Sequence, residues 1–261
     1  MQRQVMTIAG VELELFEAGE GSPILFLHGA NGFAPGHPYV GPLAARHRLI
    51  APSHPGFGTS SLPDWIDTPD DIAYIHLELL DRLGLHQVDV IGCSLGGWIA
   101  CELATKHPER IRRMVLVGPV GVKTGPVDRL DIPDMFALPQ EKLEKLVFHD
   151  PARMRMDPSR LTDEQLAISV RNRETLALLT WEPYMHNPKL PHRLHRLAAP
   201  TLFIRGASDG LVSAPYIEAY ARLLPDARIA TIAEAGHAPQ AEQPDEFVRT
   251  ALAFLESGDV R

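Results

Sequence analysis

One stretch of sequence decides the fold class: Val88-Asp89-Val90-Ile91-Gly92-Cys93-Ser94-Leu95-Gly96-Gly97. The apolar, β-branched run from Val88 predicts a buried central strand, and a helical pattern opens at Gly97. Between them, the G-x-S-x-G pattern is typical of a sharp strand-to-helix turn, in which glycines leave room for a crowded backbone and the serine hydroxyl projects out of the sheet. The helix N-terminus behind Ser94 supplies N–H groups and a positive dipole end, which favour a developing oxyanion. The stretch therefore predicts an α/β protein with Ser94 as a nucleophile.

Strand and helix patterns alternate on both sides of this stretch. Such alternation is typical of a mostly parallel sheet with helices on both faces. The clean apolar–acidic alternation of Val11 to Leu15 predicts an antiparallel strand with one face in solvent. We expect strands at residues 11–16, 24–28, 47–51, 88–93, 113–117, 201–205 and 228–232, and helices at 70–83 and 97–107.

The strand–helix alternation stops between residues 118 and 197, where prolines interrupt short helical patterns and no strand pattern occurs. The clearest helices there span residues 138–149 and 162–180, and the second opens with Thr162-x-x-Gln165, which fits a capping box. We therefore expect residues 1–118 and 198–261 to form a core domain, and residues 119–197 to form a helical cap, or lid, inserted into it.

Charge and composition exclude several function classes. The formal net charge is -8, and Lys and Arg do not cluster as binding to nucleic acid requires. The N-terminus has no apolar signal-peptide core, and no apolar run is long enough to cross a bilayer. Only Cys93 and Cys101 are present, without a Cys-x-x-Cys pair, so we expect free thiols that pack as small apolar residues. These features favour a cytoplasmic protein with a small-molecule substrate and neither nucleic-acid nor membrane partners; they do not determine the oligomeric state.

Two further strand ends supply partners for Ser94. Asp209 follows the strand expected at residues 201–205, and His237 follows the strand that ends at Ile232. Ligand sites of open α/β sheets gather at the carboxyl ends of the strands. A serine needs a base, and the base needs an acid to orient it, in the chain order serine, acid, histidine. We therefore predict a catalytic triad of Ser94, Asp209 and His237.

The loop after the strand at residues 24–28 is the candidate for a second oxyanion donor. Glycines frame it on both sides, so its backbone N–H groups can turn towards Ser94. We assign the oxyanion hole to the N–H groups of Ala30 and Leu95, with Asn31 as an alternative for the first. His28, which opens this loop, is interpreted as a buried histidine that fixes the loop rather than as a base.

With these residues in place, the chain resembles the α/β-hydrolase superfamily, specifically the lid-bearing branch of small esterases and carbon–carbon bond hydrolases. The resemblance covers nearly the whole chain and rests on His28-Gly29, Pro55-Gly56-Phe57-Gly58-Thr59-Ser60, the Ser94 turn, Gly206 to Asp209 and Gly236-His237-x-x-x-x-Glu242-x-Pro244. It implies an eight-stranded type of sheet, the triad roles given above, a two-donor oxyanion hole and a lid over the active site.

The activity predicted from these residues is that of a carboxylesterase acting through an acyl-enzyme, with no metal or cofactor. The apolar lid sequence favours a small to medium apolar ester. Candidate residues of the substrate pocket are Asn31, Phe136, Trp181, Tyr184 and Ala238.

Two alternatives use the same scaffold. The first is hydrolysis of a carbon–carbon bond in a vinylogous diketone, for which Arg171 or Arg173 of the lid would hold the substrate carboxylate. Hydrolases of ring-cleavage diketones often carry Asn before the nucleophile and Trp after the histidine, where this chain has Cys93 and Ala238. The second alternative is a small-ligand receptor, against which the complete triad argues. The chain also has Ser53 where many relatives have an aspartate ahead of the Gly-Phe-Gly turn.

Overall fold

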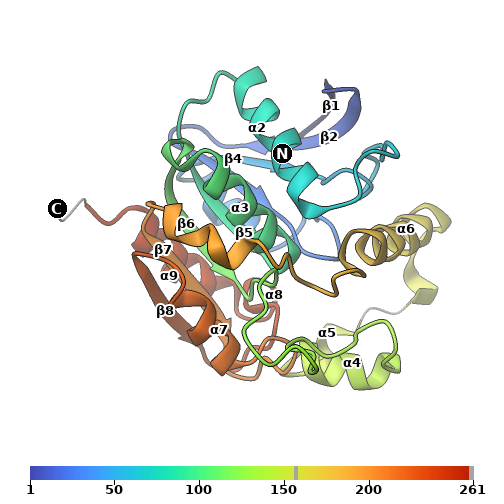
Figure 1. Ribbon diagram of the computed structural model, residues 1–261. Coiled ribbons are helices and arrows are strands. Elements are labelled where there is room, and N and C mark those ends of the chain that lie inside the picture. Colours follow the sequence, from blue (N-terminus) through green and yellow to red (C-terminus); the bar gives the residue numbers. More distant parts are fainter. Residues whose placement is uncertain (156–157, 259–261) are drawn as a thin grey trace.

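An eight-stranded sheet forms the centre of the protein in the computed structural model, which describes residues 1–155 and 158–258 (Figure 1). The strand order is β1-β2-β4-β3-β5-β6-β7-β8. β2 pairs antiparallel with β1 and β4, and every other pair is parallel. The expected eight-stranded, mostly parallel sheet is therefore confirmed. The strands are β1 (Gln2–Ile8), β2 (Val11–Ala18), β3 (Pro23–Leu27), β4 (Arg48–Pro52), β5 (Val88–Cys93), β6 (Ile111–Val117), β7 (Thr201–Gly206) and β8 (Ala227–Ile232).

The antiparallel edge differs from the expectation in two ways. β1 was not expected, because it opens with the polar residues Gln-Arg-Gln and its three apolar residues, Val5, Met6 and Ile8, are too few to show a strand pattern. It forms a hairpin with β2 through Ala9 and Gly10, both with positive φ. The second difference concerns β2, whose acidic face was expected in solvent. Glu12 is exposed, but Glu14 is buried beneath Arg3 and the loop after β4.

Helices cover both faces of the sheet, as expected. Apolar side chains of α2, α3 and α7 share one core with one face, and those of α1 and α9 share a second core with the other. α2 begins with a capping box between Thr68 and Asp71, which fixes its start. The helices of this part are α1 (Val40–Ala44), α2 (Pro69–Arg82), α3 (Leu95–Lys106), the 3-10 turn η1 (Pro108–Arg110), α7 (Ala214–Ala221), α8 (Pro239–Glu242) and α9 (Pro244–Leu255).

The segment between β6 and β7 is called the inserted segment below (residues 119–197), and its longer helices lie beside the sheet in Figure 1. Its described residues form helices and turns, with one isolated β-bridge between Gly121 and His186. This bridge pairs the beginning of the segment with its end. The predicted capping box between Thr162 and Gln165 is confirmed at the start of α6. The elements are α4 (Gln140–Val147), α5 (Pro151–Met154), η2 (Pro158–Arg160), α6 (Asp163–Thr180), η3 (Leu190–His192) and η4 (Leu194–Arg196).

Candidate active site

Ser94 lies on a strained turn between β5 and α3. Its φ of 52° and ψ of -112° are unusual for a residue other than glycine, as a turn that exposes a nucleophile requires. The close packing explains the flanking glycines. A Cβ on Gly92 would lie 2.6 Å from the carbonyl oxygen of Gly96, and a Cβ on Gly96 would lie 2.1 Å from that of Leu27. The turn is thus pressed against the end of β3.

The three predicted triad residues lie within hydrogen-bond distance of one another. His237 Nε2 lies 3.0 Å from Ser94 Oγ, and His237 Nδ1 lies 3.0 Å from Asp209 Oδ2. The other carboxylate oxygen of Asp209 accepts N–H bonds from Leu211 at 3.0 Å and Val212 at 2.8 Å. These bonds fix the carboxylate, which in turn orients the imidazole towards the serine.

Tight backbone contacts bring together the loop that carries Asp209, hereafter the acid loop, and the loop that carries His237, hereafter the histidine loop. A Cβ on Gly206, at the end of β7, would lie 2.0 Å from the carbonyl oxygen of Gly236. Gly118, at the end of β6, has a φ of +49° and lies against the ring of His237, because a Cβ there would approach the ring to 3.0 Å. The strand ends therefore leave no room for side chains at these positions: the backbone of Ala235 and Gly236 fills the space beside Gly206, and the His237 ring fills the space beside Gly118.

The loop expected to form the oxyanion hole lies directly over Ser94. A Cβ on Gly29 would lie 3.3 Å from Ser94 Cβ. Gly29 to Gly32 form a turn closed by a bond from Gly32 N–H to the Gly29 carbonyl oxygen, 3.1 Å. Within the described residues, the N–H groups of Ala30, Asn31 and Leu95 have no hydrogen-bond acceptor, so they are available to an oxyanion.

Three buried histidines hold this loop from beneath. His28 Nδ1 donates to the Gly29 carbonyl oxygen at 2.7 Å, and His28 Nε2 accepts the N–H of His54 at 2.9 Å. His54 Nε2 donates to the His28 carbonyl oxygen, so its Nδ1 accepts from His76 Nε2 at 2.8 Å. Each ring therefore has one defined neutral tautomer.

The interpretation of His28 as a buried residue that fixes its loop agrees with these contacts. Burial lowers the pKa of His28 to about 4 and that of His76 to about 3, and burial with the neighbouring histidines lowers that of His54 well below its usual value. The roles of His54 and His76 could not be predicted, because three histidines 22 to 26 residues apart share no local pattern.

Glu14 supplies a carboxylate near Ser53, the position where many relatives have an aspartate. Its side chain accepts from Ser53 Oγ at 2.7 Å, from Arg3 Nε at 2.7 Å and from Thr59 N–H at 3.3 Å. Burial raises the pKa of Glu14, but these bonds outweigh burial and lower it below its usual value. A carboxylate from the neighbouring strand thus holds the turn after β4.

The inserted segment contacts the loops of both triad partners through its backbone. The carbonyl oxygen of Val147 accepts the N–H of His237 at 2.6 Å, and that of Leu146 accepts the N–H of Gly210 at 2.9 Å. Glu242 joins the same parts, because its two oxygens accept the N–H groups of Gly236 and of His149, each at 2.7 Å. The end of α4 is therefore attached to the acid and histidine loops.

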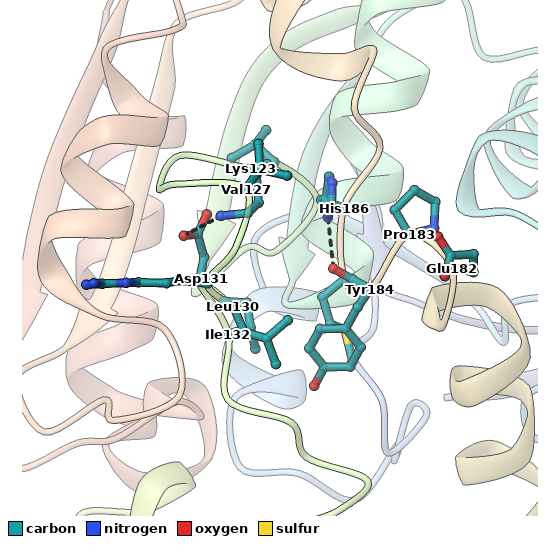
Figure 2. A pocket seen from close by; sticks show the side chains of 12 residues that line it. Lys123, Val127, Leu130, Asp131, Ile132, Glu182, Pro183, Tyr184 and His186 are labelled. Carbon is teal, nitrogen blue, oxygen red and sulfur yellow. Dashed lines mark hydrogen bonds and ion pairs between the residues drawn. The ribbon is translucent and has the colours of Figure 1, made fainter.

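The aromatic residues expected in the substrate pocket gather within the inserted segment. The ring of Phe136 lies 5.8 Å from that of Trp181 and 6.3 Å from that of Tyr184, centre to centre. Trp181 is 57% exposed. Tyr184 donates to the Pro133 carbonyl oxygen and lines a cavity of about 170 Å³ with residues 122–123, 127, 129–132, 182–183 and 185–186 (Figure 2). No triad residue lines this cavity, whereas Ala238 directly follows His237 and Asn31 belongs to the oxyanion loop.

The two arginines considered for a substrate carboxylate donate to backbone carbonyls. Arg171 donates to Gly58 and Ser60, and Arg173 donates to Met135 at 3.3 Å. The guanidinium of Arg173 also lies 5.8 Å from the centre of the Phe136 ring. In this conformation both arginines serve the packing of the inserted segment.

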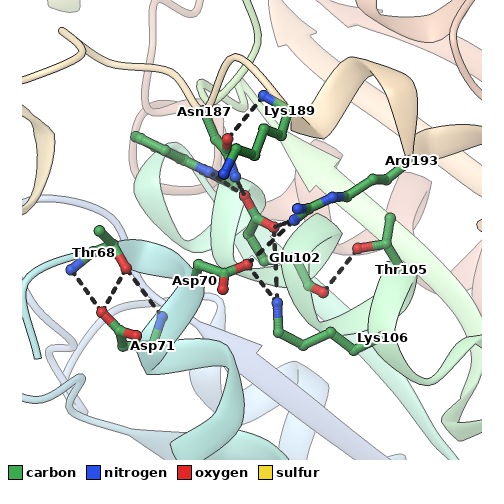
Figure 3. Close-up of polar contacts among 10 residues, drawn as sticks. Thr68, Asp70, Asp71, Glu102, Thr105, Lys106, Asn187, Lys189 and Arg193 are labelled. Atoms are coloured by element: carbon green, nitrogen blue, oxygen red, sulfur yellow. Dashed lines mark hydrogen bonds and ion pairs between the residues drawn. The ribbon is translucent and has the colours of Figure 1, made fainter.

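A network of polar and charged side chains joins α3 to the start of α2 and to the end of the inserted segment (Figure 3). Glu102 Oε1 accepts from Trp98 Nε1 at 3.0 Å and from Asn187 Nδ2 at 2.8 Å, so it connects α3 with the end of the inserted segment. Lys106 and Arg193 lie near its other oxygen, at 3.9 and 4.0 Å. Burial raises the pKa of Glu102, and its contact with Asp70 raises it further.

Both cysteines are free and buried, as expected, and burial raises the pKa of each thiol to about 12. Over residues 1–155 and 158–258, no three His, Cys, Asp or Glu side chains are grouped to hold a metal ion. Within the same ranges, no helix has the length and apolar character needed to span a membrane.

A strained serine at a strand-to-helix turn, with a histidine and an aspartate from later strand ends, defines the class of α/β hydrolases. The chain matches the Alpha/beta hydrolase family over residues 24–250 and belongs to it.

Relatives of similar length share this family. The chain is 29% identical to a 2-hydroxymuconate semialdehyde hydrolase of Pseudomonas putida and 28% identical to a 2-hydroxy-6-oxo-6-phenylhexa-2,4-dienoate hydrolase of Burkholderia cepacia, covering 96% of this chain and 93% of each relative. A thermophilic esterase from Thermogutta terrifontis has the same fold, with a TM-score of 0.77, 24% identity and 98% coverage of both chains. A meta-cleavage product hydrolase from Pseudomonas fluorescens IP01 does so with a TM-score of 0.75, 24% identity and 97% coverage of both chains.

Proposed function

We propose that the chain is a serine hydrolase that cleaves a carbon–carbon bond beside a ketone in a vinylogous diketone. The array of Ser94, His237 and Asp209 at the strand ends carries the hydrolase part of this proposal. The substrate class is supported by the relatives named for dienoate and semialdehyde substrates, which match over almost the whole chain. This likeness favours the diketone over the ester that the sequence first suggested.

The proposed reaction is an acyl transfer in two steps. His237 Nε2 takes the proton of Ser94 Oγ as the oxygen attacks the ketone carbon, and the N–H groups of Leu95 and Ala30 hold the oxyanion. The bond to the neighbouring carbon breaks, and the departing carbon receives the proton from His237. Water then attacks the acyl-enzyme, with His237 again as base, and releases the carboxylic acid. Asp209 stabilises the charged imidazole throughout.

A carboxylesterase is the second candidate, and four residues of this chain favour it. Arg171 and Arg173 donate to backbone carbonyls rather than standing free for a substrate carboxylate. Cys93 and Ala238 stand where hydrolases of ring-cleavage diketones often have Asn and Trp. Both candidates use the same nucleophile, base and oxyanion hole, so they differ only in the group that leaves.

Turnover of two substrate sets by the purified protein tests the proposal. One set contains 2-hydroxy-6-oxo-dienoates with methyl or phenyl at the ketone, followed by loss of the dienoate absorbance and by chromatography of the released acid. The other contains p-nitrophenyl esters of increasing acyl length. We expect a higher kcat/KM for a dienoate, abolished in Ser94→Ala. Turnover of esters alone would replace the proposal by the esterase, and unchanged turnover in Ser94→Ala would refute both.

A further inference from the structure

One side chain of the inserted segment reaches the oxyanion loop. Asn172 of α6 is 4% exposed, and its amide is bonded at both ends. Nδ2 donates to the carbonyl oxygen of Asn31 at 3.0 Å, and Oδ1 accepts the N–H of Gly58 at 3.0 Å. A buried amide is costly unless its polar atoms are bonded, so these two bonds determine how the side chain is oriented.

The bond to Asn31 fixes a particular peptide of the oxyanion loop. The peptide between Asn31 and Gly32 is held through its oxygen by Asn172 and through its N–H by the Gly29 carbonyl oxygen. His28 holds that same Gly29 oxygen from the core. The turn is therefore fixed by His28 on one side and by Asn172 on the other. The N–H groups of Ala30 and Asn31 make no hydrogen bond within the described residues.

The other end of Asn172 is attached to a turn of the core that is itself well held. The turn that precedes Gly58 is closed by a hydrogen bond from the N–H of Phe57 to the carbonyl oxygen of His54, 2.8 Å. On the same helix, Thr175 Oγ1 donates to the Gly56 carbonyl oxygen at 2.9 Å. A Cβ on Gly32 would lie only 2.9 Å from Asn172 Nδ2, so the amide packs tightly against the oxyanion loop.

We propose that Asn172 is a positioning residue for the oxyanion hole. By holding the Asn31 carbonyl, it sets the direction of the N–H groups that receive the oxyanion, and the hole is complete only while α6 is docked. The inference rests on the proposed acyl chemistry but not on whether the substrate is a diketone or an ester. Loss of one oxyanion donor lowers kcat by about 100- to 1,000-fold, so a misdirected donor should lower it by about 10- to 100-fold.

Two nearly isosteric variants on one helix separate positioning from docking. Asn172→Asp keeps an oxygen for the Gly58 N–H but, in its ionised form at pH 8, places a second oxygen against the Asn31 carbonyl, with no proton between them. Thr175→Val removes the neighbouring bond between α6 and the core and leaves the oxyanion loop untouched. Both variants and the parent protein are compared by hydrogen–deuterium exchange of the peptide containing residues 29–33, by the rate of reaction with a fluorophosphonate, and by kcat and KM for p-nitrophenyl butyrate.

We expect Asn172→Asp to speed exchange in residues 29–33, to slow phosphonylation and to lower kcat by about 10- to 100-fold, with KM within about twofold. Thr175→Val should change none of these quantities by more than about twofold. Unchanged exchange in Asn172→Asp, or equal losses in both variants, would overturn the inference. A parent protein that neither reacts with the fluorophosphonate nor turns over any substrate would refute the proposed function instead, and the exchange data would still decide whether Asn172 holds the turn.

Discussion

The core and the inserted segment contribute to the candidate active site in different ways. The core supplies Ser94, Asp209 and His237 as side chains, each placed by the end of a strand. The inserted segment touches the same loops mainly through backbone oxygens, those of Leu146 and Val147, and through the amide of Asn172. In the proposed reaction the core therefore supplies the groups that react, whereas the inserted segment holds the loops that carry them.

This difference predicts two kinds of effect. Loss of a triad residue of the core should abolish activity, whereas loss of a contact made by the inserted segment should lower both activity and stability. A substitution in the triad that keeps the shape and the hydrogen bonds of the side chain should remove a step of the proposed reaction and leave the fold intact. A residue that joins the segment to the loops also stabilises the folded state. The following predictions test this difference, from the largest effect to the smallest.

Asp209→Asn should lower kcat by about 1,000-fold or more, because an amide favours the wrong tautomer of His237. The fold should persist, since the remaining amide oxygen can still accept from Leu211 and Val212. Steady-state rates and a thermal melt of the same preparation measure both effects. Ser208→Ala is the matched control, because Ser208 Oγ contacts His149 rather than the triad. Comparable rates in Asp209→Asn and its parent would contradict the role of Asp209.

Gly236→Ala should break the attachment of the inserted segment. Its Cβ would lie 2.2 Å from the carbonyl oxygen of Val147, so the end of α4 must move away from His237. We expect about 2–3 kcal/mol lower unfolding free energy, together with a lower kcat. Urea unfolding provides the free energy, and Gly36→Ala, where a Cβ meets nothing within 4 Å, is the control. If Gly236→Ala is as stable and active as Gly36→Ala, the contact between Gly236 and Val147 does not hold the inserted segment in place.

Stability should fall as the pH drops from about 7 towards 4, because the folded state keeps three buried histidines neutral. Their folded pKa values lie below the usual 6.5, at about 4 for His28 and about 3 for His76, so the unfolded chain takes up protons first. Each histidine contributes up to about 1.4 kcal/mol per pH unit in this range.

His76→Gln tests this origin, because a glutamine amide can still donate to His54 Nδ1. The slope of unfolding free energy against pH between 6 and 5 should decrease by about one proton's contribution, about 1.4 kcal/mol per pH unit. His107→Gln, which replaces an exposed histidine outside this cluster, is the matched control. An equal slope in His76→Gln and the parent would show that His76 is not the source.

Glu102→Gln should have the smallest effect and should be stabilising at neutral pH. The raised pKa means that the folded state favours the protonated carboxyl, so stability is lost as the pH rises from about 4.5 through the folded pKa. Glutamine keeps an oxygen for Trp98 and Asn187 without the charge. Urea midpoints at pH 4.5 and 7.5 measure the difference, which should grow with pH. A variant that is no more stable than the parent at pH 7.5 would contradict this account.

The sequence predicted those parts of the molecule that depend on a motif or on the periodicity of a short segment. Ser94 lies in a fixed pattern, and Asp209 and His237 each follow an apolar strand, so periodicity alone brings them to one edge of the sheet. The edge strand β1 has only three apolar residues among polar ones, too few to predict a strand. The partners of His54 and Asn172 lie 22 to 141 residues away along the chain, and only the packed structure identifies them.

The site at which a fluorophosphonate attaches to the intact protein tests the central claim most directly. Mass spectrometry of the whole chain and of its peptides should show a single adduct, on Ser94, formed much more slowly in Asp209→Asn and absent in Ser94→Ala. An unlabelled parent protein, or an adduct that persists in Ser94→Ala, would contradict the assignment of Ser94 as the nucleophile of this hydrolase.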